Sequence, residues 1–514
     1  MSLSQTHSVS RVQTLALVGM SAADVEVEVQ LSNGLPSFAI VGLPDKAVAE
    51  SRERIRAAFS AIGLALPPRR ITVNLAPADV GKEGSHYDLP IALGLLMALG
   101  VVPSDTAQGR LAIGELGLDA SLRAVPGVLV AAVAAAERGL GLICPASSGA
   151  EAAWLGQDVD ILAPRNLLAL VNHVSGHQAL APPEITEPDS QELYPDLADV
   201  RGQESAKRAL EIAAAGAHNL LMIGPPGAGK SMLAARLAGL LPPLDPPEIL
   251  EVGMIHSIGG RIEGGKLSNA RPFRNPHHAA SMAAMVGGGT YAKPGEISLA
   301  HKGVLFLDEL PEFSRSVLEA LRQPLESGKV TIARANGHAT YPSRFQLIAA
   351  MNPCRCGYIE DPAAACSKAP KCAADYQNRI SGPIFDRIDM HIEVPALSPE
   401  ELSLPKPTEG SAEVRARVIA ARTVQVERFA HYANCQMRTN TELEGDILDD
   451  VCKPAPQALD LLRRASERLR LTARGYFRVL RVARTIADLD GAEIIGKLHV
   501  AEAVSFRRKF VRQP

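Results

Sequence analysis

Hydrophobic and polar positions divide the chain into three parts. In the first part they alternate over residues 25–29 (VEVEV) and 71–75 (ITVNL), and this period of two is typical of half-buried strands. Longer segments with helical character lie between or after them, at 46–61, 89–99 and 127–138. This mixture predicts an α/β domain in the first part.

In the second part the apolar runs are short and uninterrupted, at 220–223, 304–307 and 345–351. Such runs are typical of strands buried on both faces, and a helix expected at 232–241 suits a crossover between parallel strands. Beyond residue 395 the sequence is rich in Ala, Leu and Arg. We therefore predict a parallel sheet in the second part and a helical lid in the third.

The segment 181–195 separates the first two parts. It contains four prolines among acidic residues and has no continuous apolar face, which is typical of a linker. The predicted domains are therefore 1–180, 196–395 and 396–514, and a chain of 514 residues is long enough for all three.

Composition and charge narrow the classes of protein. Hydrophobic residues make up 46% of the chain and charged residues 21%, which is a globular composition. Lys and Arg number 53 against 56 Asp and Glu, so a general basic coat for nucleic acid is excluded and any such charge must be concentrated locally. The longest apolar run, 89–102, is shorter than the ~20 residues of a membrane helix. We expect a cytoplasmic protein with no membrane segment and no secretory signal.

A phosphate-binding loop follows the apolar run 220–223. The next eight residues match the pattern G-x-x-x-x-G-K-[ST] and stand between a predicted strand and a predicted helix. They are Gly224, Pro225, Pro226, Gly227, Ala228, Gly229, Lys230 and Ser231. Glycines let backbone N–H groups surround phosphate oxygens, and the helix N-terminus adds partial positive charge. We predict that Lys230 reaches the β- and γ-phosphates of ATP and that Ser231 ligates Mg²⁺.

Acidic and amide side chains end the next two predicted strands. Asp308 and Glu309 follow 304–307, where Asp308 can hold Mg²⁺ and Glu309 can polarise an attacking water. Asn352 follows 345–351 and can orient the same water. A solvated acidic strand end and an ordinary Asn-Pro turn are the alternatives for the two positions.

Arginines suggest how charge on the γ-phosphate is stabilised. Arg387 is our candidate for an arginine finger that reaches a neighbouring subunit, the alternative being an ion pair within the chain. Arg474, Arg478 and Arg481 share one helical face. Between Arg463 and Arg484 the only acidic residue is Glu467, so this stretch needs an anionic partner.

Together these residues resemble the ComM/YifB family, a magnesium-chelatase-like branch of the AAA+ ATPases with an N-terminal Lon-protease-like domain. The resemblance covers nearly the whole chain and is carried by the motifs 38–45 (FAIVGLPD), 73–79 (VNLAPAD), 88–93 (DLPIAL), 276–278 (PHH), 295–301 (GEISLAH), 379–383 (RISGP) and 473–476 (ARGY) with 481–484 (RVAR).

The resemblance implies a homo-hexameric ring that hydrolyses ATP with Mg²⁺ and acts on single-stranded or branched DNA, with recombination proteins as further partners. It implies a branch-migration helicase in natural transformation. It also implies that Asn352 is the first sensor, Arg387 the finger and Arg474 the second sensor, with Arg481 the other candidate. The alternative is an ATPase subunit that drives metal insertion, as in magnesium chelatase.

Two insertions mark this branch of ATPases. Residues between Lys230 and Asp308 include three glycine-rich stretches and the pair His277 and His278. Later, two short strands flank the turn at 336–337 (NG), which is a strong hairpin signal, and carry Lys329 and Arg334. In related rings such hairpins face the central pore, so we expect these four side chains to bind DNA. For the histidines, a local structural role is the alternative.

The N-terminal domain resembles Lon protease at 114–118 and 122–127, but no lysine occurs where a Ser–Lys pair needs one, at 128–136. Ser85 therefore lacks a base in this pattern. We expect a binding platform rather than a protease. A non-catalytic scaffold is the remaining alternative, which the intact nucleotide motifs disfavour.

Four cysteines lie within nineteen residues: Cys354, Cys356, Cys366 and Cys372. Four thiolates suit a tetrahedral Zn²⁺, although one C-x-C spacing is tighter than in common zinc motifs. Free thiols and a redox-active pair are the alternatives.

Overall fold

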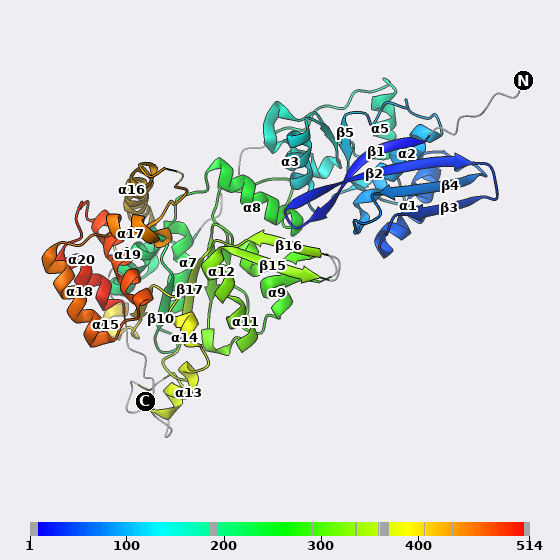
Figure 1. Cartoon of the computed structure of the whole chain (residues 1–514). Helices are drawn as coiled ribbons and strands as arrows, with labels where there is room; N and C mark the ends of the chain where they lie inside the picture. Colours follow the sequence, from blue (N-terminus) through cyan, green and yellow to red (C-terminus); the bar gives the residue numbers. More distant parts are fainter. Residues whose placement is uncertain are drawn as a thin grey trace, which may run out of the picture.

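The computed structural model describes residues 9–185, 194–289, 292–334, 337–357, 359, 370–403, 405, 407–433 and 435–507. Figure 1 shows three bodies in a row, with the N-terminal domain at one end, the parallel-sheet core in the middle and the C-terminal helices at the other end. The predicted α/β fold with a helical third part is confirmed. Most of the predicted linker lies outside the described residues.

The N-terminal domain is a mixed seven-stranded sheet in the order β3-β4-β2-β1-β5-β8-β9. Helices α1 and α2 pack on one face and α3 on the other. Neighbouring residues of β1 point to opposite faces, so Ala16 shares a hydrophobic cluster with α1 and α2 whereas Leu15 shares one with α3. Its elements are β1 (Ser10–Val18), β2 (Ser21–Ser32), β3 (Ser37–Val41), α1 (Lys46–Ala61), β4 (Arg70–Ala76), α2 (Asp88–Ala98), β5 (Arg110–Ala112), β6 (Glu115–Leu116), β7 (Leu122–Arg123), α3 (Val128–Arg138), β8 (Gly141–Ile143), α4 (Gly149–Ala152), β9 (Ile161–Leu162) and α5 (Leu167–Val174).

The core is a parallel five-stranded sheet in the order β11-β14-β17-β10-β18. Because β14, β17 and β10 are adjacent, the residues that follow them meet at one edge. The elements are α6 (Glu204–Gly216), β10 (Leu220–Ile223), α7 (Lys230–Leu240), α8 (Pro246–Ile258), β11 (Phe273–Arg274), α9 (Met282–Val286), β12 (Gly287–Gly288), β13 (Lys293–Pro294), α10 (Glu296–Leu299), β14 (Val304–Leu307), α11 (Arg315–Ala320), α12 (Arg322–Ser327), β15 (Lys329–Arg334), β16 (Gly337–Pro342), β17 (Gln346–Met351), α13 (Lys371–Gln377), α14 (Gly382–Phe385) and β18 (Met390–Glu393).

The C-terminal helices pack on the core through α16 and α19, which share a hydrophobic cluster with α6 and α7. They are α15 (Pro399–Leu402), α16 (Ser411–Ala430), α17 (Gly445–Val451), α18 (Pro456–Leu469), α19 (Ala473–Leu489) and α20 (Lys497–Ser505). No described helix has both the length and the apolar character to cross a membrane, and most of the apolar run at 89–102 lies in the buried helix α2 instead.

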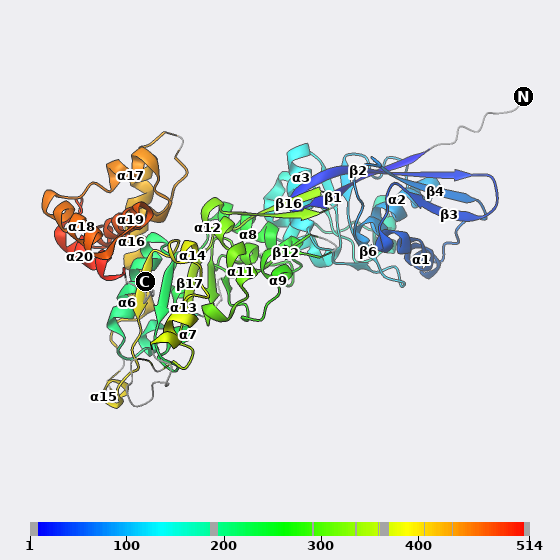
Figure 2. The same cartoon turned by 60° about the horizontal axis from the view of Figure 1, so that its bottom comes forward.

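The N-terminal domain is docked on the core at two places, visible in Figure 2 where α3 lies near α8 and β1 near β16. At the first, the buried carboxylate of Glu151 accepts hydrogen bonds from Ser257 Oγ at 2.5 Å and from the Leu129 N–H at 3.1 Å. At the second, the turn at Gly19 approaches Thr340 so closely that a Cβ there would lie 3.2 Å from its carbonyl oxygen. The hairpin of the core is therefore braced by the N-terminal domain.

A buried histidine connects the core to the C-terminal helices and predicts an acid-sensitive fold. His218 Nε2 lies 2.8 Å from Thr485 Oγ1, and burial lowers the pKa of His218 to about 4. Because the unfolded histidine binds a proton below a pKa of about 6.5, stability falls as pH drops from 7 to 5, by about 2 kcal/mol for this one group. Urea unfolding at the two pH values measures the loss, and His218→Gln should reduce its pH dependence. An equal pH dependence in the variant would contradict the assignment.

Candidate functional site

The phosphate loop connects the carboxyl end of β10 to α7, as the sequence predicts for this fold. Gly227 and Gly229 have left-handed φ angles of 77° and 86°, which glycine adopts without strain. A Cβ on Gly224 would lie 2.0 Å from the Val394 carbonyl oxygen, so only glycine fits where the loop passes the end of β18. The loop can therefore present its backbone N–H groups to an anion at the start of α7.

Lys230 and Ser231 begin α7 and face the ends of the neighbouring strands. Lys230 Nζ donates to the carbonyl oxygens of Gly224 and Pro225 at 2.8 and 2.9 Å. Burial lowers the pKa of Lys230, while the carboxylates of Asp308 and Glu309 oppose that shift. Ser231 Oγ donates to Asp308 Oδ2 at 2.5 Å. A hydroxyl and a carboxylate in contact form an oxygen donor pair that suits Mg²⁺.

Asn352, at the end of β17, joins this group. Its Oδ1 accepts a hydrogen bond from Lys230 Nζ at 3.1 Å. The side chains predicted from three separate strand ends therefore lie together at one edge of the sheet.

Glu309 lies beside Asp308 and in contact with the first insertion. Its φ angle of 51° is left-handed, and its N–H donates to Asp308 Oδ1 at 2.9 Å. Glu309 Oε2 is 3.2 Å from His278 Nδ1, and the rings of His277 and His278 lie 4.1 Å apart. The structure therefore places His278 at the carboxylate expected to activate water, a contact that the sequence did not predict.

Arg387 lies at the opposite edge of the sheet from Lys230. Its carbonyl oxygen accepts from Asn219 Nδ2 at 3.2 Å, and Asn219 immediately precedes β10. About 10 Å of strand separates this end of β10 from the phosphate loop. The guanidinium is buried, pairs with the Glu326 carboxylate and donates to the Pro383 carbonyl oxygen at 2.8 Å. Arg387 is therefore distant from the phosphate loop of its own chain.

Arg474 lies near the same carboxylate as Arg387, with Nη2 3.6 Å from Glu326 Oε1, and its side chain is 63% exposed. Arg481 differs, because it donates to the Leu443 carbonyl oxygen and burial lowers its pKa. Arg478 pairs with Asp389. Of the two candidates for the second sensor, Arg474 is the one with an exposed guanidinium.

The predicted hairpin is present, with β15 and β16 paired from Lys329 opposite Pro342 to Arg334 opposite Gly337. Lys329 is exposed, and His277 is exposed on the other insertion. The side chain of Arg334 and the turn residues 335–336 lie outside the described part. DNA binding by these side chains stays a prediction.

Cys354, Cys356 and Cys372 lie together beyond Asn352, whereas Cys366 lies outside the described residues.

In the N-terminal domain the Ser85 hydroxyl donates to the carboxylate of Glu115. Lys82, three residues earlier, is buried, and its ammonium group donates to the Pro77 carbonyl oxygen. The ammonium of Lys82 and the hydroxyl of Ser85 therefore each donate to a different group rather than forming a Ser–Lys pair with each other. The expectation of a domain without protease activity remains a prediction.

Glu326 is the site residue that sequence reasoning missed. It lies on the short helix α12, directly after Pro324 and Leu325, and its side chain is half exposed. An acid in such a helix gives no signal in the sequence, because its two arginine partners come from segments 61 and 148 residues away. Only the tertiary structure brings the three together.

Comparisons with known families match all three parts of the chain. The family described as "Magnesium chelatase, subunit ChlI" matches residues 196–402, "Subunit ChlI of Mg-chelatase" matches 27–148, and "Magnesium chelatase, subunit ChlI C-terminal" matches 408–507. The first of these contains the phosphate loop, Asp308, Glu309, Asn352 and Arg387, and the last contains Arg474.

Full-length relatives agree with these matches. The chain is 44% identical over 501 residues to "Uncharacterized protein YifB" of Escherichia coli, covering 97% of each chain. It is 44% identical over 508 residues to "Competence protein ComM" of Haemophilus influenzae, again covering 97% of each. The "Magnesium-chelatase 38 kDa subunit" of Cereibacter sphaeroides is 23% identical over 342 residues, which cover 58% of this chain and 86% of that protein. The chain therefore belongs to the ComM/YifB family of magnesium-chelatase-like AAA+ ATPases.

Proposed function

We propose that this protein is an ATP-driven motor that works as a homo-hexameric ring on single-stranded or branched DNA, moving junctions during recombination in the cytoplasm. The observation that carries the proposal is the division of the nucleotide-binding groups between two opposite edges of the core sheet. One edge holds Lys230, Asp308 and Glu309, and the other holds Arg387 and Arg474.

The phosphate-loop edge has the donors that ATP and its metal need. Backbone N–H groups of the loop bind the phosphates, and Lys230, which now donates to loop carbonyls, turns to the β- and γ-phosphates. Ser231 and Asp308 are the residues that would hold Mg²⁺, which supplies charge neutralisation of the phosphates when bound.

Hydrolysis needs a base and an orienting group near the γ-phosphate. Glu309 serves as the base that polarises water, and Asn352, in contact with Lys230, orients the same water. Because His278 contacts Glu309, a ligand that moves the insertion also changes the position of the base. Nucleotide hydrolysis and binding at the insertion are therefore coupled.

The opposite edge completes the site of a neighbouring subunit. Arg387 and Arg474 lie too far from their own phosphate loop to reach its nucleotide, whereas head-to-tail association brings them to the next one. A closed ring follows if each subunit contributes one edge to each contact. Glu326 pairs with Arg387 until the nucleotide of the neighbour replaces it.

DNA as the substrate is supported by the hairpin and by the relatives. Lys329 is exposed at the base of the hairpin, and Arg334 is at its tip. The match to the competence protein ComM extends over 97% of the chain at 44% identity, whereas the match to the magnesium-chelatase subunit extends over 58% at 23% identity. This difference in coverage favours the DNA function over metal insertion, the alternative function.

The proposal is tested by measuring ATP hydrolysis without DNA, with single-stranded DNA and with a four-way junction, followed by junction unwinding. We expect both DNAs to stimulate hydrolysis and the junction to be separated only with ATP. An ATP hydrolysis rate that is the same with and without DNA, together with no junction unwinding, would overturn the DNA function but not the ATPase activity.

Replacing Lys329 and Arg334 together with Ala should weaken DNA binding and make it less dependent on salt. Each lost phosphate contact reduces the magnitude of the slope of log K against log[salt] by about 1, so the slope of the double variant should be smaller in magnitude by about 2. Fluorescence anisotropy over a salt series measures both quantities. A matched control is Lys46→Ala with Arg52→Ala, two exposed basic residues of α1. Equal slopes in the two double variants would exclude the hairpin as the DNA contact.

A further inference from the structure

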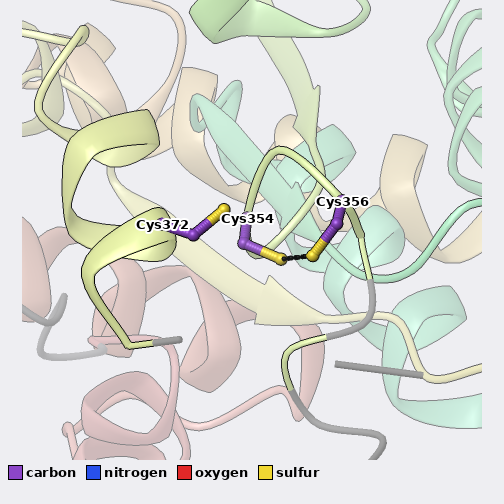
Figure 3. A group of neighbouring side chains, drawn as sticks. All are labelled: Cys354, Cys356 and Cys372. Atoms are coloured by element: carbon purple, nitrogen blue, oxygen red, sulfur yellow. Dashed lines mark hydrogen bonds between the residues drawn. The ribbon is translucent and has the colours of Figure 1, made fainter. Parts of the chain in front are cut away.

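We propose that Cys354, Cys356 and Cys372 bind a zinc ion that fastens the segment after Asn352 beside the phosphate loop. The three thiols come from two separate elements, because Cys354 and Cys356 follow β17 whereas Cys372 lies on α13 (Figure 3). Their sulfur atoms all lie within 4.8 Å of one another. This convergence of three thiols is the observation that carries the proposal.

The spacing of the sulfur atoms suits a tetrahedral ion. Cys354 Sγ and Cys356 Sγ are 3.1 Å apart, and all three cysteines are free rather than joined in disulfides. Ligands at 2.3 Å in a tetrahedron lie about 3.8 Å from one another. Because Cys354 Sγ and Cys356 Sγ are closer than this and all three sulfur atoms lie within 4.8 Å of one another, small side-chain rotations are sufficient to coordinate the ion.

The chemistry of the donors favours zinc over the other uses of thiols. A redox-active pair needs two cysteines, and it gives no reason for a third thiol to approach from another helix. Thiolates are soft ligands, and Zn²⁺ accepts them in a tetrahedron without changing oxidation state. The three described thiols leave one position of the tetrahedron for a further donor.

The site would stabilise the nucleotide-binding edge. Gly357, just after Cys356, packs so closely on the phosphate loop that a Cβ there would lie 2.5 Å from Pro226 Cδ. Gln377, at the end of α13, donates to the Pro353 carbonyl oxygen at 3.0 Å. A zinc ion would therefore connect α13 to the loop that begins at Asn352 and touches the phosphate loop.

The test measures metal in the full-length protein purified with a reductant and without chelators from zinc-supplemented cells. We expect about one zinc ion per chain by mass spectrometry of the elements. Cys354→Ser and Cys372→Ser should lose most of it, whereas Cys435→Ser, a free cysteine outside the cluster, should keep it. Cobalt substituted for zinc should show the visible bands of a tetrahedral ion and charge transfer from thiolates.

A second measurement does not depend on whether the variants fold. A mercurial reagent added to the wild-type protein should release zinc as these thiols react, and a colorimetric chelator reports the release. Wild-type protein without zinc while its thiols are reduced would overturn the proposal, and so would unchanged zinc in both cluster variants. Neither readout depends on DNA or on ATP hydrolysis, so failure here is distinct from failure of the proposed function.

Discussion

Glu309→Gln should abolish most ATP turnover while ATP still binds. The substitution removes the carboxylate that we propose polarises water but keeps the size and shape of the side chain. A positioned base contributes about 10²- to 10⁴-fold, so we expect turnover to fall by at least about 100-fold. Because Gln can adopt the same backbone as Glu, the left-handed φ of 51° adds no new strain to the variant. Steady-state phosphate release and binding of a fluorescent ATP analogue measure the two effects.

Glu312→Gln is the matched control for this experiment. Glu312 lies three residues further along, loses the same charge on substitution, and pairs with Arg379 at 2.8 Å, whereas Glu309 contacts His278. It should retain nearly full turnover. If Glu309→Gln hydrolyses ATP as fast as the control, the base is another residue.

The grouping of side chains at the phosphate-loop edge was predictable from the sequence because these residues come after the ends of predicted strands. Lys230, Asp308 and Asn352 each follow a short apolar run, and in a parallel sheet the carboxyl ends of neighbouring strands lie at the same edge. The order β14-β17-β10 then brings these three side chains together. Here a local pattern was enough to predict a tertiary arrangement.

The contact between His278 and Glu309 was beyond the reach of the same reasoning. His278 lies in a glycine-rich insertion with short elements, where Gly260, Gly264 and Gly265 have left-handed φ angles. Such a segment has no period from which its path can be inferred. The resemblance to related rings led to the expectation that His278 binds DNA, and the structure adds a contact that links the insertion to the expected base.

Arg474 and Arg481 show the limit of helical periodicity. Both lie on one face of α19, and the sequence left open which of them is the second sensor. The structure distinguishes them by their surroundings, because Arg481 is held by the Leu443 carbonyl oxygen whereas Arg474 remains exposed near Glu326. A helical pattern shows which side chains share a face, and it does not show how deep each one lies.

Arg387→Ala should reduce ATP turnover by about 10³-fold or more, because an arginine finger contributes 10³ to 10⁵ in rate. The variant should still bind ATP, since Arg387 lies at the edge of the sheet opposite the phosphate loop. Arg344→Ala is the control, because Arg344 is exposed and its ion pair with Glu442 spans 3.5 Å. Turnover by Arg387→Ala within a few-fold of this control would contradict the finger role.

Mixing two inactive variants decides whether Arg387 acts on the neighbour. Arg387→Ala keeps an intact phosphate loop, and Lys230→Ala keeps an intact Arg387. In a mixed ring the contacts that pair the first variant's nucleotide with the second variant's arginine are complete, so turnover should return. If Arg387 served its own nucleotide, every site in the mixed ring would lack one group and the mixture would stay inactive. A differently tagged copy of each variant shows by co-purification that mixed rings have formed. Turnover can return in such rings only if the phosphate-loop edge of one subunit lies against the Arg387 edge of the next, because the two edges are separated within a single chain.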